Sequence, residues 1–320
     1  MKVLVASSID PGAVAVLDQR YDLTHALTSD PCALTNAVVG QEIVVMRSGV
    51  RLTGDVMAAA DCLRLVVRAG SGLDNIDLDQ ARRRDIRVVR IPGMSAPPVA
   101  EFTFALLLAL ARKVVFADRL LREGHWPKPQ LGGPLLHGRT LGVIGAGNIG
   151  GLVGQMGAAW GMHVLGSVSA PDGRVAMDLL SRGITLVDNE QVLAESDYLS
   201  LHVPLDDRTR HLIGRAELER MKPGSLLVNM ARGGVVDEAA LYEALTSGDT
   251  VAGAALDVHE HEGEGTISPF VGLDNVVLTP HIGAMALDSQ RLIGERVVEL
   301  LDAYHHGQLE AEVRNGEHVV

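Results

Sequence analysis

The chain has 320 residues, which is enough for two domains of ordinary size. Its net charge of −12 disfavours nucleic acid or an anionic membrane as a main partner, so we expect contact with neither. Aromatic residues make up only 3% of the chain. The cores must therefore consist mainly of Val, Leu, Ile and Ala, as in buried parallel sheets and the helices that cover them.

In the first third of the chain, strand patterns alternate with helical patterns. The expected elements are strands at 3–6, 43–46 and 65–68 and helices near 13–19 and 54–60. This order predicts βαβ units and a parallel sheet. Ala96-Pro97-Pro98 closes a cluster of helix breakers, and a long apolar helix is expected from Val99 onward. We place the first domain boundary between them.

The amino terminus predicts a cytoplasmic protein, and the spacing of the cysteines argues against a metal site. Met1-Lys-Val-Leu-Val-Ala begins directly with a strand pattern and lacks the features of a signal peptide. Cys32 and Cys62 do not have the spacing of metal ligands. We expect both cysteines to be buried or half-buried small residues.

A glycine motif near the middle of the chain is the strongest single signal. An apolar strand from Thr140 runs into Gly145-x-Gly147-x-x-Gly150 and then into a helical segment rich in Ala and Gly. In such a motif the first glycine permits a tight turn, the second lets the backbone approach a pyrophosphate, and the third lets helix and strand pack closely. The motif predicts a dinucleotide-binding loop, and an ordinary strand-to-helix turn is the alternative.

The rest of the chain continues the alternation of strands and helices. Further strand patterns lie at 163–166, 198–202, 226–229, 253–256 and 276–278. They predict a doubly wound nucleotide domain. The segment from Asp237 to Gly248 has an acidic first turn and a closing glycine, as in a well-capped helix. A last helix, from about Leu287 to His306, is expected to return to the first domain.

Polar residues follow three of these strands. Arg232, Asp257 and His281 each come just after a strand pattern, at the sheet edge where open α/β sheets bind ligands. There an arginine fork can grip a carboxylate, and an acid can raise the pKa of a neighbouring imidazole and orient it. A solvated arginine and a packed histidine are the alternatives. The run from His259 to Glu262 also suggests zinc, but no third His or Cys ligand is obvious nearby, so we expect no metal.

The first domain has a glycine loop of its own. The strand that ends at Arg68 leads into this loop, where the backbone amides of Ser71 and Gly72 could hold a carboxylate. Arg47, after the preceding strand, would add positive charge. The alternative is a glycine-rich turn stabilised by polar side chains, with both arginines ion-paired on the surface.

Several segments, in this order and over nearly the whole chain, resemble the D-isomer-specific 2-hydroxyacid dehydrogenase family; they are 68–77, 145–150, 202–205, 222–237 and 279–284. The resemblance is closest to the D-3-phosphoglycerate dehydrogenase branch, and we expect this chain to lack the C-terminal regulatory domain that some members carry. It implies an α/β fold of two Rossmann-like or flavodoxin-like doubly wound parallel-sheet domains with an interdomain cleft. The expected domains are a substrate-binding domain, 1–98 with 287–320, and an NAD(P)-binding Rossmann domain, 99–286.

The resemblance implies three catalytic residues. Arg232 would hold the substrate's carboxylate and carbonyl, His281 would donate and accept the proton, and Glu262 would be its partner acid. The family's usual Phe and Pro around this acid are His259 and Gly263 here. Two rival acids therefore remain, Glu260 and Glu264.

The resemblance also implies binding residues. Those expected to contact the cofactor are Gly145, Gly147, Asn148, Ile149, Gly150, Ser167, Val168, Ser169, His202, Val203, Pro204, Thr209, Ala231, Asp257 and Gly283. Those expected to contact the substrate are Arg47, Arg68, Ser71 and Gly72. Asp257 would contact the nicotinamide carboxamide, and the turn at 202–204 would wall the adenine.

One departure concerns the cofactor. Val168 stands where the second strand of the nucleotide fold should end in an acid that binds both ribose hydroxyls. Without that carboxylate a 2′-phosphate is no longer repelled, and Ser167, Ser169 and Arg174 could contact it. We expect NADP or dual use of NAD and NADP, although no arginine immediately follows the strand.

The implied function is reversible reduction of a 2-oxo acid to a D-2-hydroxy acid by a cytoplasmic NAD(P)-dependent homodimer, with the helix after Val99 in the interface. Arg47 and Arg68 suggest a second anionic group on the substrate, as in 3-phosphoglycerate. Glyoxylate, hydroxypyruvate and phosphite are alternative substrates. A non-catalytic dinucleotide sensor, as in the corepressor relatives, is the alternative of another class.

Overall fold

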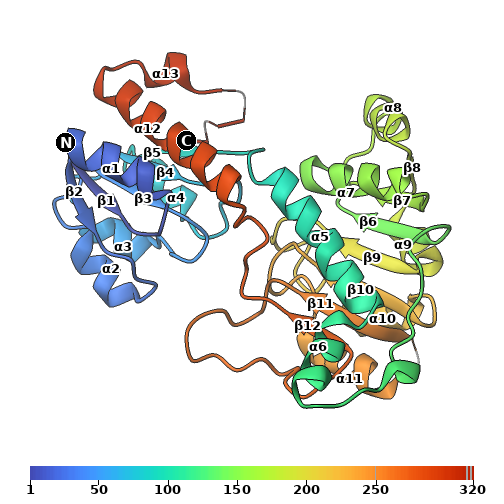
Figure 1. The fold of residues 1–320 in the computed structure, drawn as a ribbon. Coiled ribbons are helices and arrows are strands. Elements are labelled where there is room, and N and C mark those ends of the chain that lie inside the picture. Colours follow the sequence, from blue (N-terminus) through green and yellow to red (C-terminus); the bar gives the residue numbers. More distant parts are fainter. Residues whose placement is uncertain (249, 315, 318) are drawn as a thin grey trace. The chain divides into compact units, whose positions relative to one another are not determined.

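The computed structural model describes residues 1–248, 250–314, 316–317 and 319–320. The chain divides into two compact units (Figure 1). The first unit consists of Met1–Ser95 and Ala284–Val320, and the second unit is Ala96–Gly283.

In the first unit a parallel sheet has the order β2-β1-β3-β4-β5, which is the flavodoxin-like order of a doubly wound domain. Its strands are β1 (Lys2–Val5), β2 (Asp22–His25), β3 (Ile43–Met46), β4 (Leu65–Arg68) and β5 (Arg87–Arg90). Its helices are α1 (Pro11–Arg20), α2 (Pro31–Ala37), α3 (Gly54–Ala59), α4 (Leu78–Arg83), α12 (Leu287–His305) and α13 (Leu309–Glu312).

Both faces of this sheet are covered. Alternate residues of β1 point to opposite faces, so Val3 and Val5 pack with α1 and α12, whereas Leu4 packs with α2, α3 and α4. β3 and β4 are buried at every position, which accounts for their continuous apolar runs.

In the second unit a parallel sheet has the order β12-β11-β10-β9-β6-β7-β8. Its strands are β6 (Thr140–Ile144), β7 (His163–Ser167), β8 (Ile184–Leu186), β9 (Tyr198–Leu201), β10 (Ser225–Asn229), β11 (Val251–Leu256) and β12 (Val276–Leu278). Its helices are α5 (Ala96–Ala111), α6 (Val114–Arg122), the 3₁₀ helix η1 (Lys128–Gln130), α7 (Asn148–Ala159), α8 (Gly173–Ser181), α9 (Asn189–Glu195), α10 (Arg215–Arg220) and α11 (Glu238–Ser247).

β6 is the point at which the strand order of this sheet reverses. In register, Ile144 at its end pairs with Ser167 of β7 on one side and with Leu201 of β9 on the other. The loops that follow these three strands therefore leave the sheet at the same level. A switch point of this kind is where doubly wound sheets bind dinucleotides.

Most of the expected elements are confirmed. The strands at 43–46 and 65–68 and the helix after Asp237 match to the residue, and Gly248 closes that helix with a left-handed φ of 74°. The expected breaker Ala96-Pro97-Pro98 is wrong, because these residues form the first turn of α5, where a missing proline N–H costs no helical hydrogen bond.

The expectation for the cysteines is also wrong. Both Cys32 and Cys62 are exposed. Cys32 lies in the first turn of α2, where its N–H donates to the capping Asp30, and Cys62 lies in the turn after α3. A helix start and a turn both face solvent. No helix in the described part of the chain has the length and apolar character needed to cross a bilayer.

Candidate active site

The glycine loop after β6 has the space that each glycine role requires. Gly145 has φ +91°, and a Cβ there would lie 2.6 Å from the carbonyl oxygen of His202. A Cβ at Gly150 would lie 2.3 Å from the carbonyl oxygen of Gly145. A Cβ at Gly147 would have no heavy atom within 4 Å, so the backbone there is open to a ligand. α7 begins at Asn148, and its opening N–H groups have no acceptor within the helix. The loop therefore fits a pyrophosphate.

The turn that starts at His202 packs directly against this loop. A Cβ at Gly145 would also lie 2.8 Å from Cγ1 of Val203. Burial lowers the pKa of His202 to about 3, and its Nε2 lies 2.8 Å from Oγ of Ser200. Thr209 closes the turn by donating its hydroxyl to the carbonyl oxygen of Pro204 at 2.6 Å. His202 is therefore neutral near pH 7 and suits a wall better than an acid–base role.

The end of β7 presents no carboxylate at the position of the ribose-binding acid. Val168 is half-buried there, and Ser169 is exposed. The hydroxyl of Ser167 donates to Oδ1 of Asn189 at 2.5 Å. Ser169 is thus the more accessible of the two serines that flank Val168.

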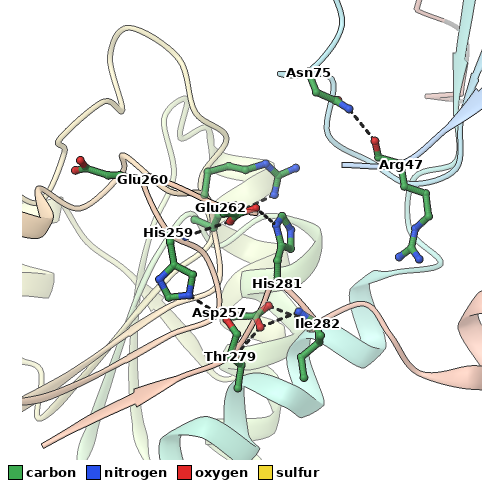
Figure 2. Close-up of polar contacts among 12 residues, drawn as sticks. Arg47, Asn75, Asp257, His259, Glu260, Glu262, Thr279, His281 and Ile282 are labelled. Atoms are coloured by element: carbon green, nitrogen blue, oxygen red, sulfur yellow. Dashed lines mark hydrogen bonds and ion pairs between the residues drawn. The ribbon is translucent and has the colours of Figure 1, made fainter. Parts of the chain in front are cut away.

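Asp257 anchors the loop that carries His281 (Figure 2). Its Oδ1 accepts from the Ile282 N–H at 2.9 Å and from the Thr279 hydroxyl at 2.6 Å, and its Oδ2 accepts from the Gly283 N–H at 2.8 Å. Its backbone oxygen accepts from the His281 N–H at 2.7 Å. Because Asp257 is only 2% exposed, these contacts form away from water and fix the loop firmly.

The backbone of His281 is itself strained, since its φ is +55°, a value that residues other than glycine adopt at a cost. Such a conformation persists only where its surroundings enforce it. The four bonds to Asp257 supply that enforcement. Asp257 thus positions His281.

Asp257→Asn should loosen this loop. One carboxylate oxygen becomes an NH₂ group, which cannot accept a backbone N–H, so we expect the free energy of unfolding to fall by about 1–3 kcal/mol. The turnover number kcat should fall with it, because His281 loses its fixed orientation. Urea unfolding and kcat measured on the same preparation check this, with the exposed Asp207→Asn as control. A free energy of unfolding in D257N equal to that of the wild type would contradict the anchoring role.

His281 and Glu262 are in direct contact. Nδ1 of His281 lies 2.9 Å from Oε2 of Glu262, and Oε1 of Glu262 accepts from the His259 N–H at 3.1 Å (Figure 2). Burial alone would raise the pKa of Glu262, but the hydrogen bond and the charge of His281 outweigh it and hold that pKa below its usual range. Glu262 is therefore ionised at neutral pH and can stabilise a protonated imidazole.

Of the three candidate acids, Glu262 is the one that contacts His281 in the described part of the chain. Oε1 of Glu260 lies instead 3.2 Å from Nε2 of His211, and Glu264 is exposed. Among the described residues no group of three or more His, Cys, Asp or Glu side chains is arranged to hold a metal ion.

Arg232 lies in the loop after β10. Asn229, the last residue of that strand, shapes the loop by accepting from the Ala231 N–H at 3.0 Å and donating to the Arg232 carbonyl at 3.1 Å. Nη1 of Arg232 donates to the Ala231 carbonyl at 2.7 Å. A Cβ at Gly233 would lie 1.7 Å from the carbonyl oxygen of His259. The loop of Arg232 therefore touches the loop of Glu262 backbone to backbone.

In the first unit, Arg47 and Arg68 lie at the ends of neighbouring strands. The side-chain amide of Asn75 joins the two following loops by donating to the carbonyls of Arg47 at 2.8 Å and Val50 at 2.6 Å. Arg68 is only 5% exposed and donates to the Ala69 carbonyl. Burial lowers the pKa of Arg47, whose Nη1 lies 3.2 Å from the thioether sulfur of Met285.

Ser71 and Gly72 lie in the loop after β4. Oγ of Ser71 lies 3.2 Å from Oγ of Ser95, and its carbonyl accepts from Nη1 of Arg90 at 3.2 Å. Sequence reasoning did not foresee this role of Arg90 or the organising roles of Asn229 and Thr279. Polar residues at or just after a strand end were the only signal for the last two.

The family model described as "D-isomer specific 2-hydroxyacid dehydrogenase, NAD binding domain" matches residues 104–283, which is more than half of the chain. The chain belongs to the D-isomer specific 2-hydroxyacid dehydrogenase family. This match spans the glycine loop, the Arg232 loop and the pair formed by Glu262 and His281.

Similar proteins of this family have several names. A hydroxypyruvate reductase of Thermotoga maritima is 44% identical over 93% of this chain and 96% of its own length. A D-3-phosphoglycerate dehydrogenase of Methanocaldococcus jannaschii is 38% identical over 98% of this chain but 59% of its own length, so the chain spans little more than half of that relative. The crystal structure of a D-lactate dehydrogenase from Aquifex aeolicus, complexed with NAD and lactic acid, has a TM-score of 0.87 at 30% identity and covers 100% of this chain and 99% of that one.

Proposed function

We propose that this dehydrogenase-family member reversibly reduces a 2-oxo acid to a D-2-hydroxy acid with a nicotinamide dinucleotide. The contact between His281 and Glu262, on a loop anchored by Asp257, carries the proposal. A histidine paired with an ionised carboxylate suits proton transfer near neutral pH. The glycine loop at the switch point of the same sheet fits the dinucleotide.

Arg232, His281 and Glu262 have separate roles in the proposed reaction. Arg232 grips the substrate carboxylate and polarises the carbonyl, which fixes one face of C2 for attack. The hydride itself would come from the nicotinamide ring of the bound cofactor. Protonated His281 gives its proton to the carbonyl oxygen as that oxygen gains charge, and Glu262 stabilises the imidazolium before this transfer. In the reverse direction, neutral His281 takes the hydroxyl proton.

A panel assay tests this function. The purified chain is mixed with NADH or NADPH and each of glyoxylate, pyruvate, hydroxypyruvate and a 2-oxo acid that carries a phosphate, and the loss of absorbance of the reduced cofactor is followed. Turnover of at least one 2-oxo acid is expected. A chain that binds the cofactor but reduces none of them would be a dinucleotide sensor, and one active with phosphite alone would belong to another reaction class.

For the substrate, we propose a hydroxy acid with a second anionic group, such as the phosphate of 3-phosphoglycerate. The main support is Arg47, a half-buried arginine whose contact with Met285 is a thioether rather than a carboxylate. A partly desolvated cation of this kind favours an anionic ligand. In the panel, the phosphate-bearing acid should have the highest kcat/KM. A preference for hydroxypyruvate or glyoxylate would contradict the assignment of Arg47.

For the cofactor, we propose NADP or dual use, because Val168 replaces the ribose-binding acid. Val168→Asp should raise the ratio of kcat/KM for NADH to that for NADPH by about tenfold or more, since the new carboxylate repels the 2′-phosphate. Steady-state kinetics with both cofactors measure the ratio, and Val168→Asn controls for size. A wild-type enzyme with a large preference for NADH would overturn the proposal.

We further propose a homodimer. α5 packs largely within its own unit, but every residue of α6 is at least partly exposed, and Val114, Val115 and Leu121 are each more than half exposed. Exposed apolar patches of this kind favour protein contacts. Light scattering should give twice the chain mass, and a monomer at micromolar concentration would contradict the proposal.

A further inference from the structure

The proposed chemistry requires that two loops keep a fixed position relative to each other. Arg232 follows β10, whereas Glu262 follows β11. Between these loops, Glu238 and Glu260 exchange hydrogen bonds. The Glu260 N–H donates to Oε1 of Glu238 at 2.9 Å, and the Glu238 N–H donates to Oε1 of Glu260 at 3.3 Å.

Glu238 is unusually placed for a carboxylate. It is the first residue of α11 and is only 8% exposed. The charge-bearing head of a glutamate is costly to bury unless it is hydrogen-bonded. Here the bond is to the backbone of the loop that carries Glu262, two residues before Glu262 itself. A negative charge in the first turn of a helix also interacts well with the helix dipole.

The partner, Glu260, is held from the other side as well. Its Oε1 also lies 3.2 Å from Nε2 of His211, and its side chain is 29% exposed. The neighbouring His259 places its carbonyl against Gly233 and its N–H on Glu262. Glu260 thus connects this loop to α11, and His259 connects it to Glu262. These two residues are adjacent, so one peptide unit separates the two connections.

We propose that Glu238 is a positioning residue, which holds the Glu262 loop against the Arg232 loop through its exchange of hydrogen bonds with Glu260. The inference rests on the proposed function, because it concerns the register of groups assigned to catalysis there. Glu238 touches neither substrate nor cofactor in this assignment. Its effect passes through Glu260 to Glu262 and from there to His281.

The hydrogen bond that Glu238 accepts from the Glu260 N–H suggests the right conservative variant. Burial raises the pKa of Glu238, as does the nearby charge of Glu260, although the backbone bond from Glu260 and the charges of His259 and His261 oppose this. Glutamine resembles the protonated form and keeps an acceptor oxygen for the Glu260 N–H. Alanine removes the acceptor altogether.

The experiment compares Glu238→Ala with Glu238→Gln in the full chain. E238A should lower kcat by about tenfold to a hundredfold, the scale of a misplacement of about 1 Å, while KM for the 2-oxo acid changes by less than about threefold. E238Q should keep kcat within about threefold of the wild type. Glu243→Ala is the matched control, because Glu243 lies on the same helix and pairs with Arg215 on the surface.

A second readout needs no turnover. Amide hydrogen exchange at Glu260, followed by mass spectrometry of peptides covering 257–262, should be at least about tenfold faster in E238A and unchanged in E238Q and E243A. If the wild type reduces no 2-oxo acid, the proposed function fails, and this readout still decides whether the tie exists. The inference is overturned if E238A leaves exchange and kcat at wild-type values, or if E238Q is as impaired as E238A.

Discussion

His281→Asn is expected to lower kcat by about two to four orders of magnitude, the usual contribution of a general acid–base group. In the proposed reaction the carbonyl oxygen would gain negative charge as the hydride adds, and without the imidazolium of His281 it would have to take its proton from water. Asparagine is the preferred replacement because His281 has φ +55°, and asparagine adopts this left-handed backbone more readily than most residues. Steady-state kinetics with saturating cofactor measure the effect.

The binding of cofactor should survive in H281N, because the glycine loop lies after a different strand, β6. The dissociation constant for NADH or NADPH, measured by fluorescence titration, is therefore the internal check on folding. The exposed His125→Gln is the matched control and should keep full turnover. An H281N enzyme with near-wild-type kcat would remove His281 from proton transfer.

Arg232→Ala is expected to lower kcat/KM by about two to three orders of magnitude, since in the proposed function it removes the charged donor that would both grip the carboxylate and polarise the carbonyl. Most of the loss should lie in kcat if Arg232 acts chiefly on the carbonyl in the transition state. It should lie in KM if Arg232 acts chiefly on the carboxylate in the ground state. Full kinetics with the best 2-oxo acid of the panel separate the two.

Arg232→Lys sharpens the test. Lysine keeps the charge but not the two-pronged fork, so R232K should recover only part of the activity lost in R232A. Arg215→Ala, on the surface of α10, is the matched control. Equal kcat/KM in R232A and the wild type would mean that another residue holds the substrate.

The sequence predicted the central strands well because their burial is visible as a run of apolar residues along the chain. Ile43–Met46 and Leu65–Arg68 are buried on both faces and therefore read as continuous apolar runs. The strands it missed are β2, β5 and β8. Asp22–His25 and Ile184–Leu186 lie at sheet edges and are only partly buried, so they lack such a run.

The candidate site was predicted in its residue types but not in its connections. The position of Arg232, Asp257 and His281 just after strand patterns marked them as candidates. In the structure His281 contacts Glu262 rather than Glu260 or Glu264. Hydrogen bonds such as that between Glu260 and Glu238, which lie 22 residues apart, depend on tertiary packing that no local pattern encodes. The substrate and cofactor assignments stay predictions.

In the proposed function this chain delivers a hydride to one face of a 2-oxo acid while His281 protonates the oxygen. The transfer of deuterium from the cofactor to the product tests this reaction. With reduced cofactor deuterated at the transferable C4 position, the wild type should form the D-2-hydroxy acid with deuterium at C2, and H281N should form almost none in the same time. Formation of the L enantiomer, or of a product without deuterium at C2, would contradict the account.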